Sequence, residues 1–232
     1  MNKKSLIRQI ISIANSFAKN LAVYDDFGNI SLRNKSSILI KTSGSKLISL
    51  KNNNIVELGL NEKIYGLSPM PSTDTPTHQE IYKAFGTINS IVHSHSQYAT
   101  AWAQAGKPIP CLGTTHADYW NSEIPITRDL TKDEINGEYE KETGKIIIEE
   151  IKKLNVDPLD CPGILVANHG PFTWGKTIEE AVKHAELLEY IARLAWMSLS
   201  INIDAKHISN VLLNKHFSRK HGPDAYYGQD PD

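Results

Sequence analysis

Two short apolar runs that each lead into histidine limit how this chain can fold. Residues 90–95 read Ser-Ile-Val-His-Ser-His, and residues 163–170 read Gly-Ile-Leu-Val-Ala-Asn-His-Gly. An apolar run of this length is typical of a buried strand. Side chains two positions apart on a strand share a face, so we expect His93 and His95 to point the same way. A fold that brings the two strand ends together adds His169 to this pair.

Three converging imidazoles predict a metal site of the catalytic kind. Zinc enzymes commonly use three protein ligands and leave one position open, whereas structural zinc sites close that position, usually with cysteine. The chain has only Cys111 and Cys161, so a closed cysteine site is not expected. Taken alone, a histidine near a strand end such as His169 is more often a hydrogen-bonded residue than a metal ligand. A divalent metal, with zinc first, is the leading hypothesis for all three histidines.

The composition excludes several classes of partner. The chain has 232 residues, of which 40% are hydrophobic, and a net charge of -1 with scattered lysines and arginines. We therefore expect one domain over 1–232, no nucleic-acid partner and no anionic membrane partner. Two cysteines indicate no disulfide framework and favour a cytoplasmic location. No apolar stretch reaches the ~20 residues of a membrane span.

Strand and helix patterns alternate along the chain and predict an α/β fold with a mixed sheet flanked by helices. Thr75 and Pro76 have the form of an N-cap followed by proline at the first helical position. The expected helices cover residues 6–21, 75–85, 99–105, 131–153 and 177–199, and further strands are expected at residues 28–32, 37–41 and 55–58.

Several motifs together resemble the class II aldolase and epimerase family. They are Gly-Asn-Ile-Ser at 28–31, Lys-Thr-Ser-Gly at 41–44, Ser-Thr-Asp-Thr-Pro-Thr-His at 72–78, His-Ser-His at 93–95 and Asn-His-Gly-Pro-Phe at 168–172. The stretches at 113–119, 134–140, 219–222 and 225–229 resemble the branch that converts L-ribulose 5-phosphate to D-xylulose 5-phosphate. The resemblance covers nearly the whole chain. It implies a single-domain, three-layer fold and a sugar-phosphate substrate.

The resemblance also implies the roles of individual residues. It assigns a divalent metal, usually zinc, to His93, His95 and His169, with Asp74 beside it. Without the resemblance, Asp74 would be interpreted as a favourable charge at a helix N-terminus. The resemblance assigns proton transfer to Asp118 and Tyr227, which could otherwise be a turn-capping aspartate and a packed aromatic. The expected contacts to sugar or phosphate are Asn29, Lys41, Ser43, Gly44, Ser72, Thr73, His216 and Arg219.

The chemistry of the implied substrate favours one mechanism. Inverting C4 of a 2-ketose breaks a bond at a carbon that is not next to the carbonyl, so simple proton abstraction is not activated. Transient oxidation by NAD has no support, because no glycine-rich fingerprint joins a strand to a helix. The alternative is cleavage between C3 and C4, with a metal as Lewis acid, followed by addition to the opposite face. One group must act as base and another as acid.

Some expectations remain open from the sequence. Thr42, Thr73 and Phe27 stand where the family more often has proline, serine, and tryptophan or serine, which could alter substrate handling. An aldolase of the same family would release the two fragments instead of rejoining them. A non-enzymatic domain of the same fold is a further alternative, although it would not need all three histidines. The resemblance also implies a cyclic homotetramer in which the C-terminal tail completes a neighbouring subunit's site.

Overall fold

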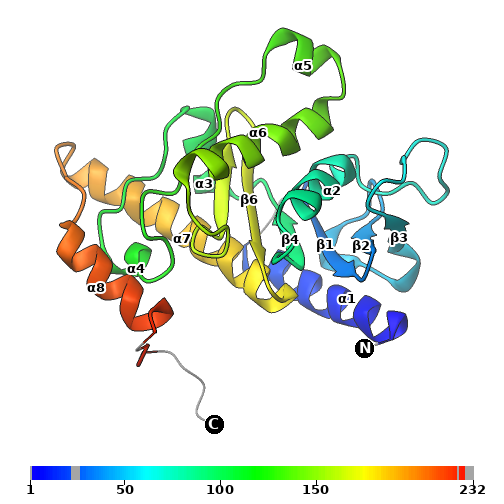
Figure 1. The fold of residues 1–232 in the computed structure, drawn as a ribbon, viewed down its shortest axis with the longest axis horizontal. Coiled ribbons are helices and arrows are strands. Elements are labelled where there is room, and N and C mark those ends of the chain that lie inside the picture. Colours follow the sequence, from blue (N-terminus) through cyan, green and yellow to red (C-terminus); the bar gives the residue numbers. More distant parts are fainter. Residues whose placement is uncertain (1, 22–26, 224, 228–232) are drawn as a thin grey trace.

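A six-stranded sheet forms the centre of the molecule (Figure 1). The computed structural model describes residues 2–21, 27–223 and 225–227, so Gly228 and Gln229 of the last motif lie outside the described residues. The strand order is β3-β2-β1-β4-β6-β5. The strands are β1 (Asn29–Asn34), β2 (Ser37–Lys41), β3 (Ile55–Gly59), β4 (Ser90–His93), β5 (Gly163–Val166) and β6 (Gly170–Gly175).

Every pair of neighbouring strands runs antiparallel. Short turns join β1 to β2 and β5 to β6, and such turns connect antiparallel strands. A parallel bridge outside the named strands joins Ile126 to Leu165 at the β5 edge. The expected α/β fold with one sheet and flanking helices is confirmed. The expected mixture of strand directions is limited to this bridge.

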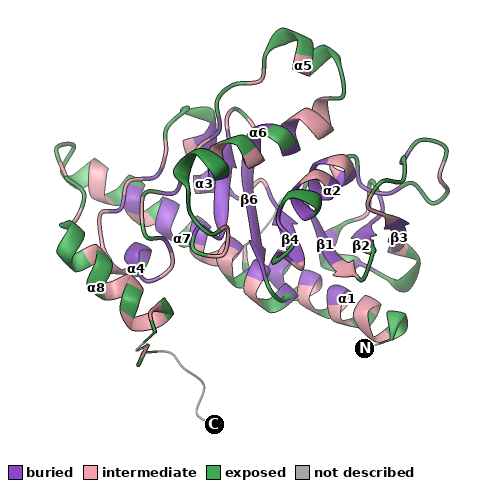
Figure 2. Cartoon of the chain, viewed as in Figure 1, coloured by how far each residue is buried: buried purple, intermediate pink, exposed green. Residues whose placement is uncertain are grey.

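Helices cover both faces of the sheet, which gives three layers (Figure 1). Successive residues of a strand point to opposite faces. Accordingly, Ile38 and Ile40 of β2 join the hydrophobic cluster beneath α2 (Thr75–Ala84) and α6 (Tyr139–Leu154). Leu39 joins the cluster beneath α1 (Lys3–Asn20) and the start of α7 (Ile178–Ile201). Figure 2 shows the strands buried between these helices. The two apolar clusters hold the sheet in place, and with it the strand ends that carry histidine.

The helices follow the expected order, with three differences. The helix expected over 131–153 is divided into α5 and α6, because Gly137 has φ -94 and ψ -129, outside the helical region. The short helix α4 was not expected. The helix at the C-terminal end, α8, was not expected either. The helices are α1 (Lys3–Asn20), α2 (Thr75–Ala84), α3 (Gln97–Gln104), α4 (Thr114–Ala117), α5 (Lys132–Asn136), α6 (Tyr139–Leu154), α7 (Ile178–Ile201) and α8 (Asn210–His221), with 3-10 turns at Leu47–Ser49 and Asn52–Asn54. None of the helices in the described ranges has both the length and the apolarity needed to cross a bilayer.

Two buried histidines away from the strand ends should make the stability of the fold depend on pH. Burial lowers the pKa of His78 to about 3 and that of His116 to about 4. The unfolded chain takes up protons at these residues near pH 6.5, whereas the folded chain does not. The free energy of unfolding should therefore fall by about 1 kcal/mol per pH unit for each residue as the pH drops from 6.5 towards 4. Denaturant titrations of metal-free protein at pH 7, 6 and 5 measure this slope, and equal stability at all three values would contradict the prediction.

Candidate metal centre

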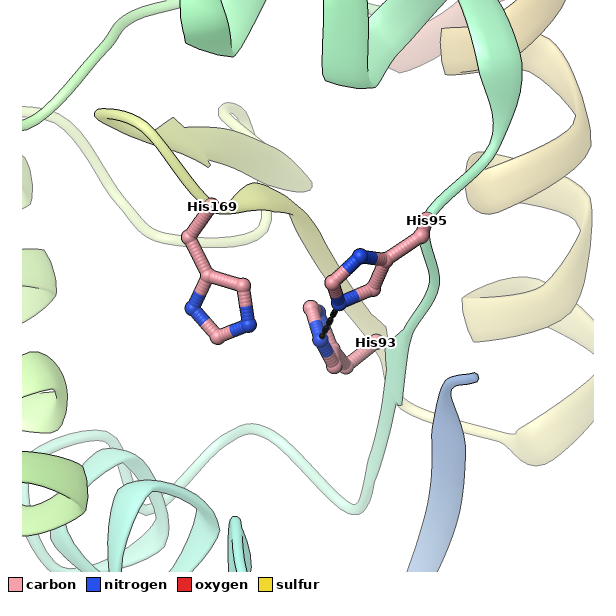
Figure 3. Close-up of side chains that lie close together, drawn as sticks. All are labelled: His93, His95 and His169. Carbon is pink, nitrogen blue, oxygen red and sulfur yellow. Dashed lines mark hydrogen bonds between the residues drawn. The ribbon is translucent and has the colours of Figure 1, made fainter. Parts of the chain in front are cut away.

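The three predicted histidines converge at one end of the central strands (Figure 3). His93 is the last residue of β4, and His169 lies in the turn between β5 and β6. His95 lies two residues beyond the strand, so strand geometry does not place it. Even so, the Nε2 atoms of His93 and His95 are 3.1 Å apart. One candidate ligand atom from each of the three residues lies within 4.8 Å of the others.

Contacts around His93 and His95 fix the direction of their rings. Nδ1 of His93 donates to the carbonyl oxygen of Pro171 at 3.0 Å, so Nε2 keeps its lone pair. The His93 ring stacks on Phe172 with 4.1 Å between centroids, and His95 stacks on Phe27 at 5.3 Å. Burial and the neighbouring imidazoles hold the pKa of His93 well below its usual value. His93 is therefore a neutral imidazole whose free nitrogen faces the other two.

Asp74 faces these imidazoles and does not cap α2 with its side chain. It occupies the N-cap position expected for Thr75, but no side-chain capping bond forms. Thr75 is the first helical residue, and its hydroxyl donates to the carbonyl oxygen of Ser72 at 2.6 Å. One carboxylate oxygen of Asp74 accepts a 2.6 Å hydrogen bond from Asn29 and lies 3.9 Å from Nε2 of His93. The carboxylate is thus held beside the histidine group.

The donor set fits a divalent metal such as zinc. Burial also lowers the pKa values of His95 and His169, and neutral imidazole is the form that binds a metal. Two nitrogens that each lie about 2.0 Å from a tetrahedral zinc ion are about 3.3 Å apart. The 3.1 Å between Nε2 of His93 and Nε2 of His95 is close to that separation. Three imidazoles with a nearby carboxylate and no thiolate form an open site of the catalytic kind.

A polar cavity of about 340 Å³ opens onto this group. Most of the residues expected in the site line it, and four residues without an expected role do so as well. Lys41 is buried there and its ammonium donates to the carbonyl oxygen of Ser45 at 2.7 Å. Gly44 has φ +69, a conformation that favours glycine. The expected lining residues are Asn29, Lys41, Ser43, Gly44, Ser72, Thr73, Asp74, His93, His95 and His169, and the additional ones are Phe27, Gly28, Tyr139 and Glu140.

Of the additional cavity residues, Tyr139 and Glu140 are the two that the sequence could most easily have indicated. Both belong to the 134–140 motif that carried the family resemblance, but the motif alone gave neither a role. They begin α6, directly after the break at Gly137. Burial raises the pKa of the Tyr139 phenol, and the charges of Asp74 and Glu140 add to that effect. The phenol therefore stays protonated near neutral pH and offers a hydrogen-bond donor to the cavity.

The remaining predicted residues form a second cluster between α4 and α8. The Asp118 carboxylate accepts from Nδ1 of His216 at 2.9 Å and from Nε and Nη2 of Arg219 at 3.0 to 3.2 Å. The Arg219 guanidinium lies 4.2 Å from the ring centre of Tyr227. Burial raises the pKa of Asp118, but the hydrogen bonds from Arg219 and His216 outweigh it and leave the pKa below its usual value. None of these four described residues lines the histidine cavity.

Metal binding at the three histidines can be tested by removing one ligand. His95→Ala should abolish stoichiometric binding of cobalt or zinc by metal-depleted protein, because two imidazoles remain where three are needed. The fold should persist, since His95 is only partly buried. The exposed His207 provides the control: His207→Ala should bind metal as the unaltered protein does. Isothermal titration with circular dichroism gives both measurements, and full binding by His95→Ala would contradict the assignment.

Comparisons with known proteins agree with this fold. The family model for the class II aldolase and adducin N-terminal domain matches residues 8–196. An L-fuculose 1-phosphate aldolase has a similar structure, with a TM-score of 0.75, 19% identity, and coverage of 94% of this chain and 97% of that one. YgbL from Klebsiella pneumoniae has a TM-score of 0.73 at 22% identity, and the match covers 93% of this chain and 99% of YgbL. A sugar-phosphate aldolase from Thermotoga maritima has a TM-score of 0.64 at 19% identity, and the match covers 86% of this chain and 97% of the aldolase.

Proposed function

Because this chain belongs to the class II aldolase and adducin N-terminal domain family, we propose that it is a metal-dependent L-ribulose-5-phosphate 4-epimerase. It would invert C4 of a ketopentose 5-phosphate and give D-xylulose 5-phosphate. The observation that carries the proposal is the three-histidine group at the wall of a polar cavity. The motifs around Asp118 and Tyr227 favour epimerisation over other reactions of the family.

The cavity supplies the groups that a sugar phosphate needs. His93, His95 and His169, with Asp74 beside them, would hold the divalent ion, which supplies Lewis-acid polarisation of sugar oxygens when bound. Asn29 fixes the Asp74 carboxylate through its 2.6 Å hydrogen bond. The hydroxyls and amides of Ser43, Gly44, Ser72 and Thr73 would bind the phosphate, with Lys41 as the nearby cation.

Asp118 and Tyr227 are proposed to move the protons. The hydrogen bonds from His216 and Arg219 keep Asp118 ionised near neutral pH, as a base requires. It would take the proton from the C4 hydroxyl as the bond between C3 and C4 breaks. Tyr227 would protonate the C4 oxygen after the bond re-forms on the opposite face. His216 and Arg219 were first expected to contact substrate. We propose instead that they hold the base and the acid together, which their contacts with Asp118 and Tyr227 support.

Replacing the proposed base should separate catalysis from metal binding. Asp118→Asn keeps the shape of the side chain but cannot accept the proton, so turnover should fall by ~10²–10⁴-fold. Metal content should not change, because Asp118 is not part of the histidine group. Initial rates with L-ribulose 5-phosphate and metal analysis of the same sample test both statements. Turnover close to that of the unaltered enzyme would remove Asp118 from the mechanism.

This mechanism requires Asp118 and Tyr227 to lie next to a cavity that contains the three histidines. Asp118 and Tyr227 are both tied to Arg219 within one chain and do not line that chain's cavity. We therefore extend the proposal to a homotetramer in which each cavity receives both residues from one neighbouring subunit. This proposal differs from the expectation that the tail alone completes a neighbouring subunit's site. Large apolar side chains exposed on α7 and just after it offer a surface for such contacts: Tyr190, Trp196, Met197, Ile201 and Ile203.

Mixed subunits test this arrangement. His95→Ala damages the cavity and Asp118→Asn damages the other cluster, so each homotetramer should be inactive. In a 1:1 reassembled mixture, about a quarter of the sites should pair an intact cavity with an intact neighbouring cluster and regain activity. A mixture of Asp118→Asn and Tyr227→Phe subunits should recover no activity, because every subunit then carries one substitution in its own Asp118–Tyr227 cluster. The absence of recovery in verified mixed tetramers of the first pair would place all these residues in one chain's site.

A class II sugar-phosphate aldolase is the second candidate. Several of the similar structures bear aldolase names, among them the L-fuculose 1-phosphate aldolase and the sugar-phosphate aldolase from Thermotoga maritima. The histidine cavity would serve cleavage equally well. Product analysis separates the two reactions. The epimerase should convert L-ribulose 5-phosphate to D-xylulose 5-phosphate, whereas an aldolase should accumulate dihydroxyacetone and glycolaldehyde phosphate.

A further inference from the structure

His169 is oriented differently from His93. The ring of His93 is held by a hydrogen bond from Nδ1 to Pro171, but Nδ1 of His169 is buried without a hydrogen-bond partner among the described residues. Figure 3 shows one ring nitrogen of His169 facing His93 and His95 while the other points away. With no hydrogen bond to direct its ring, the position of His169 depends on the backbone turn that carries it.

The backbone of the turn at 167–170 is restricted by its conformation, its hydrogen bonds and its close packing. Asn168 has φ +60, the left-handed region that Asn tolerates better than most residues. Its backbone amide donates to the carbonyl oxygen of Ala103 at 3.0 Å, and the His169 amide donates to Val166 at 3.0 Å. A Cβ at Gly170 would lie only 2.8 Å from the carbonyl oxygen of Ser94. The turn is therefore packed tightly against the segment that carries His95.

The segment 127–129 holds this turn from outside the cavity. The side-chain amide of Asn168 donates to the Asp129 carboxylate at 2.8 Å. The hydroxyl of Thr127 accepts from the backbone amide of Ala167 at 3.1 Å, and the Thr127 amide donates to Leu165 at 2.9 Å. Three hydrogen bonds thus link 127–129 to the residues leading into His169.

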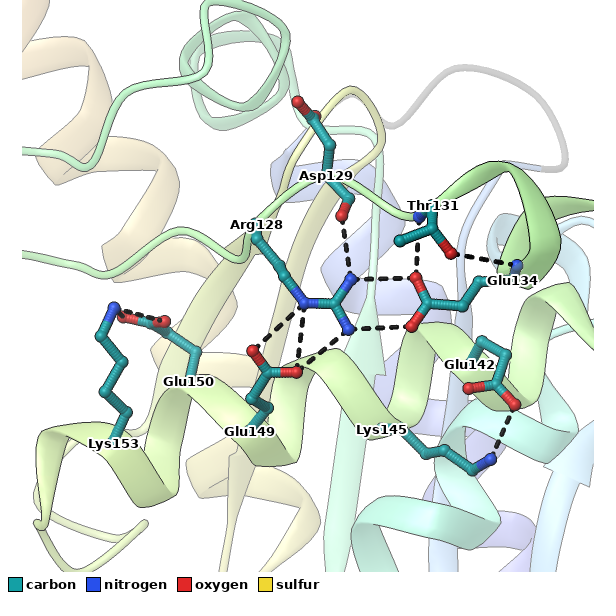
Figure 4. A network of polar contacts seen from close by, with 9 residues as sticks. All are labelled: Arg128, Asp129, Thr131, Glu134, Glu142, Lys145, Glu149, Glu150 and Lys153. Carbon is teal, nitrogen blue, oxygen red and sulfur yellow. Dashed lines mark hydrogen bonds and ion pairs between the residues drawn. The ribbon is translucent and has the colours of Figure 1, made fainter.

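Arg128 fixes this segment to two helices (Figure 4). Its guanidinium donates to the backbone carbonyl oxygen of Asp129 at 3.0 Å. It also bonds both carboxylate oxygens of Glu134 in α5, at 2.8 and 2.9 Å, and those of Glu149 in α6, at 3.0 to 3.1 Å. Because α6 begins at Tyr139, which lines the cavity, the guanidinium connects the support of His169 to a helix that also contributes to the cavity.

We propose that Asp129 is a positioning residue for His169, acting through Asn168, and that Arg128 holds Asp129 in place for this task. The proposal rests on the metal centre of the proposed function. The side chains of Asp129 and Asn168 never touch the ion, yet their hydrogen bond sets where the third imidazole stands. Groups that orient a metal-binding histidine directly typically change affinity 10–100-fold. Asp129 acts on His169 only through Asn168, so we expect its loss to lower metal affinity by about 5-fold.

A reciprocal exchange tests the hydrogen bond. Asn168→Asp alone places two carboxylates opposite each other, and cobalt affinity should fall about 5-fold with a changed visible spectrum of the cobalt-loaded protein. The double variant Asp129→Asn with Asn168→Asp restores an amide opposite a carboxylate, with the donor on the other side. Its affinity and spectrum should return to within about 2-fold of the unaltered protein. Rescue by this pair shows that the bond, and not either side chain alone, positions His169.

A surface ion pair on α6, the helix that carries Glu149, provides the control for Arg128. Arg128→Met should weaken cobalt binding about 3-fold. Lys153→Met also removes an ion pair on α6, the 3.2 Å contact with Glu150, and should change nothing. Thermal unfolding of the metal-free variants is measured in parallel. If Asn168→Asp and Arg128→Met lower the unfolding temperature but leave cobalt affinity and spectrum unchanged, the segment is only structural and the proposal fails. If the unaltered protein binds no cobalt, the metal centre itself fails, and this inference with it.

Discussion

The pairing of β4 between β1 and β6 is the constraint on which the site depends. In this register His93 lies opposite Asn29 of β1 and Phe172 of β6. The first pairing brings Asn29 within reach of Asp74, and the second places Phe172 under the His93 ring. A slip of one residue would turn His93 to the opposite face of the sheet. The apolar clusters on both faces make that slip costly, because each alternate side chain of β4 has its own buried surroundings.

The parts of the structure governed by local pattern could be predicted from the sequence. The apolar runs before His93 and His169 became strands, and the pattern after Thr75 became a helix. The position of His95 could not follow from strand spacing, because β4 ends at His93 and the backbone beyond it is held by a contact between Ser94 and Pro171. Most of the residues that the family motifs indicated line one cavity, although they come from segments far apart in the chain, and their roles stay predictions.

Other features depend on distant contacts and were missed. No residue of α8 is fully buried, so the helix lacks the strong apolar stripe that reveals a core helix. It is placed by contacts with Asp118, about a hundred residues earlier in the chain. The separation of α5 from α6 was also missed, because the periodic pattern of the segment continues across Gly137. Asp74 was expected beside the metal only by resemblance, and the Asn29 hydrogen bond supplies a physical reason for its orientation.

The position of α8 relative to the family match has a consequence for how activities in such proteins diverge. The match ends at residue 196, so the sheet, the histidine group and the cavity lie inside it, while His216, Arg219 and Tyr227 lie beyond it. Under the proposed roles, the metal-binding residues and the base Asp118 belong to the matched part, whereas the acid Tyr227 and the two side chains that bind Asp118 belong to the part beyond it. A lineage could then alter the fate of the cleaved sugar by exchanging its last helix, without disturbing the packing that creates the metal centre.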